Sequence, residues 1–411
     1  MKVCIITNTY SPDLIGGSNV YTNTIVKELQ ERNYEVVVIT ASPDRKDSIK
    51  IHGAIKIYCF HPFNISTCSE IGKKSILLQG LWTVLDIYNR YSYAKIVAIL
   101  RKESPDVVHL HTPLDITLSA FDAVKKMKLP LVFTAHDYLL LCRRVVLLHK
   151  SGEICADKNI SKFCKLYRIL TKKIIDNKAD VVIFPSEFIS RIFRDNGFFK
   201  KTKKVILPYP IQLNNTNFGT DSVGINKPNL NILYVGSLTR HKGIQILIEA
   251  VKRIKNDNLR LAIVGSGKYK NKLENMANSD KRITFYGEIS NDDIGGCYNK
   301  SDILVVPSIW NEVFGIVILE AFRAGIPVVA SRIGGITEVV KNNYNGFLFD
   351  PGDVDKLKQV LENIIKNPEA LARLGNNAKN CVKRYEASQH IKELILNYEE
   401  AIRLNRIRHY E

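Results

Sequence analysis

The sequence has no apolar stretch long enough to cross a membrane as a helix. Such a helix needs about 18 to 20 consecutive apolar residues. The two longest apolar segments, 76–88 and 129–142, are both interrupted by polar or charged side chains. The apolar run that follows Met1 is short and is typical of a first buried strand, not of a secretory signal. We therefore expect the protein to stay in the cytoplasm.

The sequence also lacks the usual cysteine pattern of a disulfide framework or a metal site. Its eight cysteines include no Cys-x-x-Cys pair, which favours reduced thiols. Cys142, Cys155 and Cys164 form the one grouping, at spacings unlike those of ordinary zinc sites, and metal binding there stays open. Asp353 and Asp355 form an Asp-x-Asp triplet of the kind that binds manganese elsewhere, but Asp353 follows Pro-Gly, where a helix N-cap is expected. We expect no metal and no other cofactor.

Negative charge is scarce relative to positive charge. The chain holds 59 Lys and Arg against 41 Asp and Glu, a net charge of +18. Residues 1–205 hold 32 and 19, a net +13, and the remainder holds 27 and 22, a net +5. A basic surface attracts nucleic acid, anionic lipid or phosphorylated substrates. Because no nucleic-acid motif accompanies the charge, we expect no nucleic-acid partner and favour peripheral binding to an anionic membrane, mostly through charge. Solvated surface lysines are the plainer alternative.

Short apolar strands alternate with amphipathic helical patterns in both halves of the chain. This alternation predicts an α/β fold with parallel, doubly wound sheets, and 411 residues suit two domains of about 200 residues each. We place one domain at 1–205, a second at 206–387 and a terminal helix at 388–411. Strands are predicted at 2–7, 35–40, 55–59, 107–111, 131–134, 181–185, 230–235, 260–264, 283–286, 303–306, 327–331 and 346–349, and the main helices at 19–32, 75–102, 115–126, 165–177, 244–254, 316–324 and 388–408.

The segment from Pro307 to Pro327 places two carboxylates eight positions apart, Glu312 in a turn and Glu320 inside the helix that follows. The start of that helix leaves backbone N–H groups free, and together with the helix dipole they form a seat for phosphate. Glu320 is placed to accept hydrogen bonds from two neighbouring hydroxyls, such as those of a ribose. The segment therefore indicates a site for a nucleoside diphosphate sugar, with the sugar beside Glu312. The expected phosphate seat consists of Val313, Phe314, Gly315 and Ile316.

The Glu312-x7-Glu320 pair is followed by Gly-Ile-Pro-Val-Val-Ala, Gly-Gly-Ile-Thr-Glu and Asn-Gly-Phe-Leu-Phe-Asp segments. This succession resembles the signature of the family-4 glycosyltransferases, and further motifs extend the resemblance over nearly the whole chain. The resemblance implies the GT-B architecture, in which two Rossmann-like domains face a central cleft and the last helix crosses back onto the first domain. It also implies retaining transfer of a hexose-type sugar from a nucleotide sugar to a glycan or lipid-linked acceptor, in cell-surface polysaccharide or glycolipid synthesis.

A second candidate element follows the first strand of the second half, where a glycine-bearing turn leads into an amphipathic helix. That context favours phosphate binding, with Lys242 supplying positive charge. In the family the matching lysine neutralises the donor diphosphate. Ser237 stands where many members carry an arginine, and Arg240 is the candidate replacement, although solvated basic side chains are the plainer interpretation. Gly16 and Gly17, after the first strand of the chain, let the backbone approach a phosphate or sugar, unless they form a simple turn.

Three histidines, His109, His111 and His136, lie at predicted strand ends. His136 is followed by Asp137 and resembles the family's histidine near the donor sugar and the acceptor. An imidazole there can bond a sugar hydroxyl or stabilise charge as the glycosidic bond loosens. A core or capping role is the favoured interpretation for His109. For His111 both roles stay open.

The implied reaction passes through an oxocarbenium-like transition state. Protein groups accelerate it by stabilising the charge that develops in that transition state. Lys242 stabilises the leaving nucleoside diphosphate, and Glu312 holds hydroxyls of the donor sugar. Family members use backbone near Gly287 to hold the base. The candidate catalytic residues are therefore His136, Lys242 and Glu312.

Two alternatives from other classes remain. The GT-B architecture also serves sugar-nucleotide epimerases and hydrolases, which need a carboxylate-rich cleft that admits water. A non-catalytic protein bound to an anionic surface is suggested by charge alone, and it predicts no loss of function when Glu312 is changed. The segments 62–102 and 139–164 are where we expect acceptor choice to be encoded.

Overall fold

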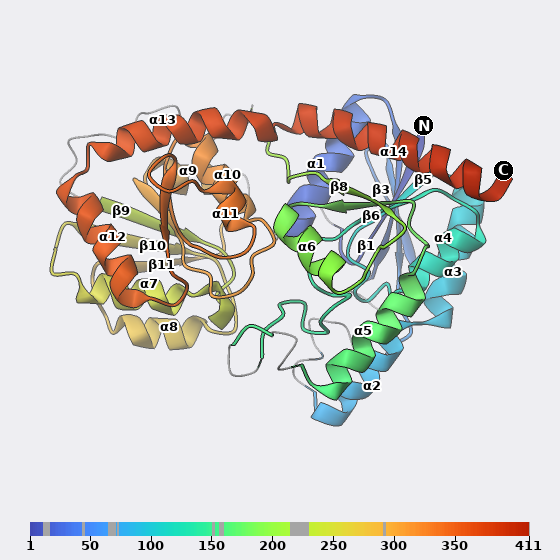
Figure 1. Cartoon of the computed structure of the whole chain (residues 1–411), viewed down its shortest axis with the longest axis horizontal. Helices are drawn as coiled ribbons and strands as arrows, with labels where there is room; N and C mark the ends of the chain where they lie inside the picture. Colours follow the sequence, from blue (N-terminus) through green and yellow to red (C-terminus); the bar gives the residue numbers. More distant parts are fainter. Residues whose placement is uncertain are drawn as a thin grey trace. The chain divides into compact units, whose positions relative to one another are not determined.

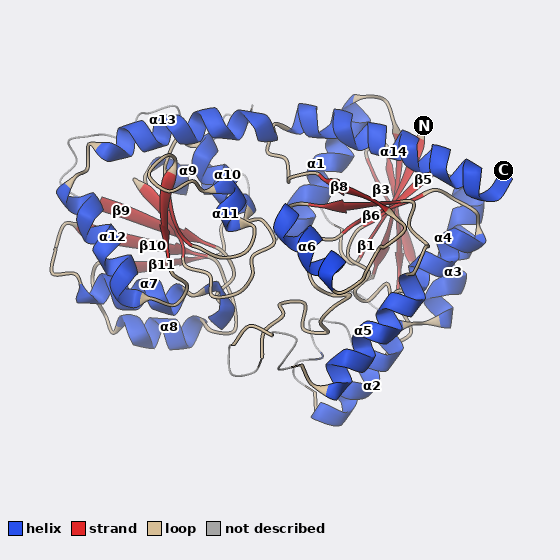
Figure 2. Cartoon of the chain, viewed as in Figure 1, coloured by secondary structure: helices blue, strands red, loops and turns tan. Residues whose placement is uncertain are grey.

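The computed structural model describes residues 1–10, 17–42, 46–64, 71, 74–149, 153–155, 160–213, 230–290 and 293–410. The chain forms two compact units, one of Met1–Pro208 with Ala387–Glu411 and one of Tyr209–Glu386. In each unit the strands lie between helices (Figure 1, Figure 2). No helix in the described ranges has the length and apolar character that a membrane crossing requires.

The first unit is built on a sheet with the strand order β3-β4-β2-β1-β5-β6-β7-β8. Its neighbouring strands run parallel except for the edge pair of β3 and β4. The last helix of the chain belongs to this unit and packs on α1 and on the central strands β5, β6 and β7. The bounds are β1 (Lys2–Thr7), β2 (Glu35–Ala41), β3 (Ser48–His52), β4 (Ile55–Phe60), β5 (Val107–Leu110), β6 (Leu131–Thr134), β7 (Val181–Phe184), β8 (Lys203–Ile206), α1 (Gly17–Glu31), α2 (Ile76–Ile87), α3 (Arg90–Glu103), α4 (Ser119–Lys126), α5 (Lys162–Ile175), α6 (Glu187–Asp195) and α14 (Ala387–Tyr410).

The second unit has an all-parallel sheet in the order β11-β10-β9-β12-β13-β14. The order reverses between β9 and β12, as it does between β1 and β5 in the first unit, which makes both sheets doubly wound. The bounds are β9 (Leu230–Val235), β10 (Leu259–Val264), β11 (Ile283–Gly287), β12 (Ile303–Val306), β13 (Val328–Ser331), β14 (Gly346–Phe349), η3 (Arg240–Lys242), α7 (Ile244–Arg253), α8 (Lys270–Ala277), α9 (Ile294–Asn299), α10 (Ile316–Arg323), α11 (Ile336–Val339), α12 (Val354–Lys366), α13 (Ala370–Val382) and η4 (Lys383–Tyr385).

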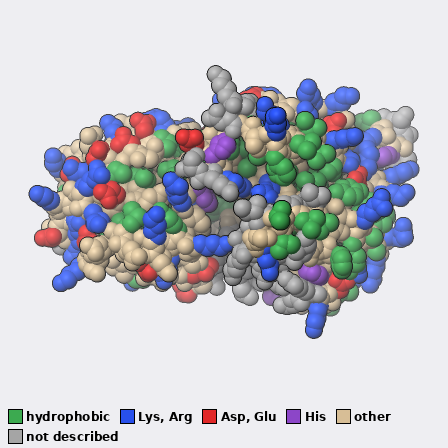
Figure 3. Space-filling model, turned by 90° about the horizontal axis from the view of Figure 1, so that it is seen from below, with side chains coloured by type: hydrophobic (Ala, Val, Ile, Leu, Met, Phe, Trp, Pro, Cys, Tyr) green, Lys and Arg blue, Asp and Glu red, His purple; other side chains and the backbone are tan. Residues whose placement is uncertain are grey.

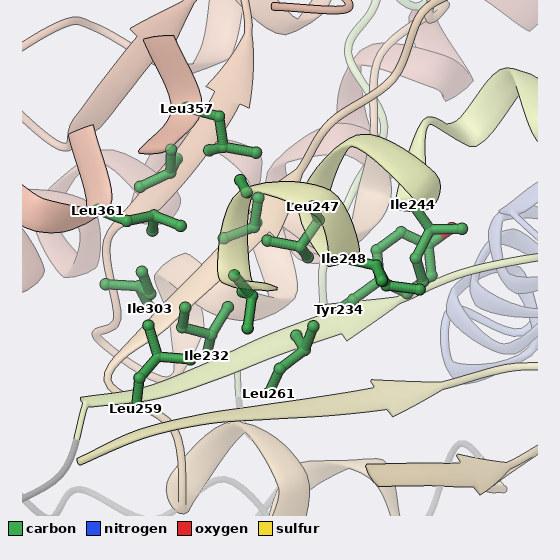
Figure 4. Close-up of a cluster of buried hydrophobic side chains, with 14 of the residues drawn as sticks. Ile232, Tyr234, Ile244, Leu247, Ile248, Leu259, Leu261, Ile303, Leu357 and Leu361 are labelled. Atoms are coloured by element: carbon green, nitrogen blue, oxygen red, sulfur yellow. The ribbon is translucent and has the colours of Figure 1, made fainter. Parts of the chain in front are cut away.

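One face of the second sheet packs against the apolar side of α7. Ile244, Leu247 and Ile248 of this helix are fully buried against β-strand residues such as Ile232 and Leu261 (Figure 4). The helical spacing of these side chains in the sequence predicted this face, and the prediction is confirmed. Packing of α7 fixes the turn that precedes it, and that turn carries Lys242.

The helix predicted over 75–102 is wrong, because the chain forms two helices there. Tyr88 has extended backbone angles, and Asn89 starts the second helix by accepting hydrogen bonds from the N–H groups of Tyr91 at 2.9 Å and Ser92 at 3.2 Å. A side chain that caps a helix competes with helix continuation. The apolar periodicity continues across the break, so it could not reveal the cap.

Three elements of the first unit escaped the sequence analysis: β3, α6 and β8. β3 is exposed along its whole length and pairs antiparallel at the sheet edge, so it lacks the apolar run by which buried strands are recognised. β8 is also at an edge and carries Lys203 and Lys204. Both strands are defined by backbone pairing with a neighbour and not by burial of their own side chains.

Candidate active site

The switch point of the second sheet brings together two segments that are far apart in the sequence. β9 and β12 are neighbours there, and the chain leaves their carboxyl ends toward Lys242 and toward Glu312. In open parallel sheets, ligands bind outside the carboxyl ends of the strands at the point where the strand order reverses. The topology therefore places both predicted residues at the edge of the sheet where a ligand is expected.

Lys242 and Glu312 form an ion pair at this edge. Lys242 Nζ lies 2.7 Å from Glu312 Oε1, and the same oxygen accepts a hydrogen bond from Ser308 Oγ at 2.7 Å. The ammonium also lies over the ring of Trp310, 5.1 Å from its centroid. The Glu312 side chain keeps 8% of its surface exposed and that of Lys242 keeps 26%. The carboxylate is thus covered, while the ammonium still reaches solvent.

The carboxylate of this pair is stabilised in its ionised form. Burial pushes the pKa of Glu312 upward, but Lys242 and hydrogen bonds from Ser308 and Trp310 outweigh burial and leave that pKa below its usual value. A buried carboxylate that stays charged needs such partners. The result is a fixed ammonium that is held in place before any ligand arrives.

Two glycines let the backbone close around the segment that carries Glu312. A Cβ on Gly243 would lie 1.7 Å from the carbonyl oxygen of Pro307, and a Cβ on Gly334 would lie 2.3 Å from that of Glu312. Both glycines have positive φ, of +74° and +59°. The N–H of Gly335 donates to the Glu312 carbonyl at 2.7 Å. The Gly-Gly motif of the sequence thus acts by holding the backbone of Glu312.

We expect Gly334→Ala to lower the free energy of unfolding of the second unit by about 1–3 kcal/mol, through the clash with Glu312 and the strained φ. Gly352→Ala is the matched control, because Gly352 also has a positive φ, of +82°, but its Cβ would meet nothing within 4 Å. Urea unfolding of both variants measures the difference. Equal losses would show that backbone strain alone, and not the close approach to Glu312, accounts for the effect.

Glu320 lies on α10 and is half-buried. Tyr298, a fully buried residue of α9, donates its hydroxyl to Glu320 Oε2 at 2.6 Å. Burial raises the pKa of Glu320, while Tyr298 and the nearby Arg323 lower it less strongly. Arg323 in turn donates to the backbone carbonyl of Gln212 at 2.7 Å. Tyr298 therefore fixes the orientation of a carboxylate whose partial exposure lets it accept further hydrogen bonds.

The predicted phosphate seat lies at the start of α10. Gly315 is its N-cap, with φ +98°, and no side chain caps this end among the described residues. Phe314 is buried against the rings of Tyr209 and Tyr385, at centroid distances of 5.4 and 5.8 Å. Val313 and Ile316 are buried too. The side chains of this segment are thus buried, and its backbone groups are the ones left for a ligand.

The other predicted donor residues of the second unit follow β9 and β11. Ser237 and Arg240 are exposed, and the Ser237 carbonyl accepts a hydrogen bond from Tyr234 Oη at 3.0 Å. Gly287 ends β11 with φ +74°, and its carbonyl accepts from the N–H of Gly265 at 2.6 Å. The two strands belong to the same parallel sheet, so all three residues lie at its carboxyl edge.

In the first unit the structure brings His109, His111 and His136 into one cluster. His136 Nε2 and His111 Nδ1 are 2.8 Å apart, and their rings stack at a centroid distance of 5.1 Å. The ring nitrogens of His109 contact Tyr398 Oη at 2.8 Å and Thr134 Oγ1 at 2.7 Å, so this fully buried histidine is a core residue. His136 is half-buried at the carboxyl end of β6.

A fourth histidine, His390 of α14, joins the cluster through Tyr21. Its Nδ1 donates to the carbonyl of Pro208 at 2.8 Å, which leaves Nε2 to accept from Tyr21 Oη at 3.2 Å. Burial lowers the pKa of His136 to about 3 and that of His390 to about 4. Burial also lowers the pKa values of His109 and His111 well below the usual value. These four imidazoles are therefore neutral at pH 7.

Several site residues carried no signal that the sequence alone could resolve. Ser308 and Trp310 stand inside the quoted 307–327 segment, but only the folded turn shows that they contact the Lys242–Glu312 pair. His241 packs edge-on against Trp310 at a centroid distance of 5.3 Å. Tyr298 lies on a short helix with no motif of its own. Each is recruited by tertiary contact and not by a pattern in the chain.

Gly17 is the first residue of α1, and Gly16 lies outside the described residues. Asp353 caps α12, as predicted, by accepting from the N–H of Lys356 at 2.8 Å. Asp355 pairs with Arg253 at 2.9 Å. The cysteines of the described ranges are free thiols, and in those ranges no three or more His, Cys, Asp or Glu side chains are arranged so that they could hold a metal ion.

Comparison with known proteins identifies the family of this chain. The sequence matches the family "Glycosyltransferase Family 4" over residues 15–214 and the family "Glycosyl transferases group 1" over residues 218–381. It is 26% identical to an uncharacterized glycosyltransferase of Methanocaldococcus jannaschii, over 98% of this chain and 99% of the relative. It is 25% identical to alpha-monoglucosyldiacylglycerol synthase of Acholeplasma laidlawii, over 98% of both chains.

Among solved structures, Anabaena HepE in complex with UDP-glucose aligns with a TM-score of 0.68 and 20% identity, over 97% of this chain and 100% of that chain. A likeness at this identity establishes the fold. The class defined by the two doubly wound units is thus the GT-B fold. The chain belongs to the family-4 type of GT-B glycosyltransferases and is a transferase enzyme.

Proposed function

We propose that this glycosyltransferase moves a hexose-type sugar, with retention of anomeric configuration, from a nucleoside diphosphate sugar to a glycan or lipid-linked acceptor. The product belongs to cell-surface polysaccharide or glycolipid synthesis. The observation that carries the proposal is the ion pair of Lys242 and Glu312 at the switch point of the second sheet, 2.7 Å apart. It supplies a fixed positive charge where a diphosphate is expected.

The donor assignment rests on three features of the second unit. The uncapped start of α10 offers backbone N–H groups to phosphate. Lys242 offers a partly exposed ammonium. Glu320, oriented by Tyr298, offers carboxylate oxygens to the ribose hydroxyls. The complex of HepE with UDP-glucose supports a nucleotide sugar as the ligand class.

In the proposed reaction the bond from the anomeric carbon to the diphosphate oxygen breaks while negative charge grows on the leaving group. Lys242 and the N–H groups of α10 oppose that charge, and because they are already fixed in place they need no reorganisation at that moment. Glu312 holds donor-sugar hydroxyls in addition to Lys242. His136, which is neutral, hydrogen-bonds a sugar hydroxyl near the reacting carbon.

We propose that no metal ion takes part in neutralising the diphosphate. The Asp353 and Asp355 carboxylates, which have the spacing of a manganese motif, are engaged with a helix N-terminus and with Arg253. The positive charge that such an ion supplies is assigned instead to Lys242 and to Arg240, which is exposed after β9.

The acceptor side is assigned to the first unit, which also carries the larger share of the positive charge. Residues 1–205 hold a net +13 against +5 for the remainder. Such a surface is attracted to anionic lipid, where a lipid-linked acceptor resides. The name of the Acholeplasma relative, a glycolipid synthase, supports this acceptor class. We therefore propose peripheral association with an anionic membrane.

The function is tested by incubating the purified protein with UDP-, GDP-, ADP- and dTDP-sugars, with and without membrane lipid extracts as acceptor. Transfer of the sugar to a lipid or glycan product supports the proposal, and proton NMR of the new linkage reports whether the configuration is retained. Epimerised nucleotide sugar, or cleavage to free sugar that acceptor does not accelerate, would contradict it.

Glu320→Gln is expected to weaken binding of the donor nucleotide by about tenfold or more, because two charge-assisted bonds to ribose are reduced to neutral ones. Glutamine keeps an acceptor for the buried Tyr298 hydroxyl, so the fold is preserved. Isothermal titration calorimetry with the cognate nucleotide measures the effect. Glu362→Gln on the exposed side of α12 is the control. Unchanged affinity in Glu320→Gln would remove this residue from the site.

A further inference from the structure

Two helices of the first unit expose large apolar side chains to solvent. On α2, Leu77 is 86% exposed and Leu81 is 53% exposed. On α5, Leu166 is 53% exposed and Ile169 is 63% exposed. Smaller exposed contributions come from Leu78, Phe163 and Leu170. The helical spacing of Leu77 and Leu81 would equally suit a helix packed on a sheet, but the structure shows that both side chains are exposed.

The exposed positions of each helix fall on one side of it. On α2, Leu77 and Leu81 lie four residues apart on one side of the helix, and the buried Trp82 and Asp86 lie on the other side. On α5, Tyr167, Thr171 and Ile175 form the buried stripe at i, i+4 and i+8. Leu166 and Ile169 lie on the side away from that stripe, Leu170 lies at its edge, and Phe163 is exposed in the first turn of the helix. Each helix therefore has an apolar face that is not covered by the described part of the protein.

The two helices are joined by Arg143. Its Nη1 donates to Thr83 Oγ1 of α2 at 2.8 Å, and its guanidinium lies over the ring of Phe163 of α5 at 5.7 Å. Trp82 of α2 and Tyr167 of α5 line the same small pocket. Figure 1 shows α2 and α5 side by side. We use the name α2–α5 face for the exposed apolar residues of these two helices, which are Leu77, Leu78, Leu81, Phe163, Leu166, Ile169 and Leu170.

Positive charge accompanies this face. The sequence of α5 holds five basic residues and no acidic one. Lys162, Lys165 and Lys173 are exposed, and they lie on the same side of the helix as Leu166 and Ile169. Hydrophobic side chains gather beside Lys and Arg on the side of the first unit that Figure 3 presents. Apolar residues mixed with lysines on one helix face are typical of helices that lie in a membrane interface.

We propose that the α2–α5 face is the surface by which the protein binds the membrane, with Leu77, Leu81, Leu166 and Ile169 inserted among the lipids of an anionic bilayer. The lysines of α5 contact the lipid phosphates. Charge complementarity selects a lipid surface over a second copy of this chain, because two copies of a basic helix would repel each other. The inference rests on the proposed membrane association but not on the proposed chemistry.

Insertion of apolar side chains into the bilayer makes part of the membrane binding resistant to salt, whereas binding through charge alone is not. Screening at about 0.5 M salt shortens the reach of surface charges to a few ångströms, so binding that depends on charge alone disappears. Burial of apolar side chains is not screened. The wild-type protein is therefore expected to bind anionic vesicles strongly at low salt and to retain part of that binding at high salt.

The test is flotation of the full-length protein with vesicles of phosphatidylcholine and phosphatidylglycerol at low and high salt. The variant with Leu77→Ser, Leu81→Ser, Leu166→Ser and Ile169→Ser is expected to bind about 100-fold more weakly and to lose the salt-resistant part. The matched control is Ile51→Ser with Leu396→Ser, because these residues are 77% and 63% exposed on β3 and α14. The control is expected to bind within about twofold of the wild type.

A direct readout uses Ile169→Trp and, as control, Ile51→Trp. Only the tryptophan fluorescence of the Ile169→Trp variant is expected to shift to the blue when vesicles are added and to be quenched by lipids with brominated acyl chains. Wild-type binding that vanishes at high salt, or equal losses in the four-fold variant and the control, would overturn the inference. The inference would also be overturned if the quadruple serine variant lost self-association but kept unaltered binding to vesicles. None of these measurements needs turnover, so their failure is distinct from failure of the proposed transferase reaction.

Discussion

Lys242→Ala is expected to lower the turnover number by about 100- to 1,000-fold, the usual effect of removing one preorganised group that stabilises charge in the transition state. The ammonium is held by Glu312, whose carboxylate also accepts from Ser308, and by the ring of Trp310, so it opposes the growing charge on the leaving diphosphate without rearrangement. A side chain that acts on developing charge affects the chemical step more than ground-state binding. Steady-state kinetics should show a larger fall in kcat than rise in KM.

The same substitution also has a structural cost. Without Lys242 the covered carboxylate of Glu312 loses its counter-charge, which destabilises the second unit by about 2–3 kcal/mol. The double variant Lys242→Ala with Glu312→Gln removes the stranded charge. It should recover most of the stability measured by urea unfolding but remain nearly inactive. Arg253→Ala, which breaks an exposed pair with Glu249 on α7, is the control and should change neither quantity. Restored turnover in the double variant would refute the catalytic role of Lys242.

Acidification from pH 7 to pH 5 is expected to destabilise the first unit by several kcal/mol. The pKa values of His136 and His390 are lowered to about 3 and about 4 in the folded protein, while an unfolded histidine titrates near 6.5. Below pH 6.5 the unfolded chain therefore binds protons that the folded chain does not, and stability falls as pH falls. Each of these two histidines contributes a loss of about 2 kcal/mol between pH 6.5 and pH 5. His109 and His111 act in the same direction.

The expected pH dependence involves the contacts that attach α14 to the rest of the first unit. His390 and Tyr398 attach α14 to Tyr21, Pro208 and His109 inside the first unit. Urea unfolding followed by circular dichroism at several pH values should show the steep loss, and His390→Gln should reduce its slope by up to about 1.4 kcal/mol per pH unit. His52→Gln, at an exposed histidine of β3, is the control and should leave the slope unchanged. A slope that is equal in wild type and His390→Gln would show that burial of His390 does not carry the effect.

Local patterns in the sequence determined the buried framework of both sheets. β1, β6, β9 and β12 have the bounds that their apolar runs predicted, because a strand inside a parallel sheet buries both faces and must be apolar throughout. The edge strand β14 also has its predicted bounds. The helix that carries Glu320 was likewise marked by its apolar residues. The Glu312–Glu320 spacing and the glycine motifs indicated the family before any contact was known.

Tertiary structure alone decided how these residues act. Glu312 pairs with a lysine 70 positions away, because β9 and β12 are neighbours at the switch point, and no local pattern encodes strand order. The sequence also did not reveal that the helix breaks at Asn89 or that Leu77 and Leu81 are exposed. A leucine at helical spacing has the same pattern whether it faces a core or solvent, since periodicity records which side of a helix is apolar but not what covers that side.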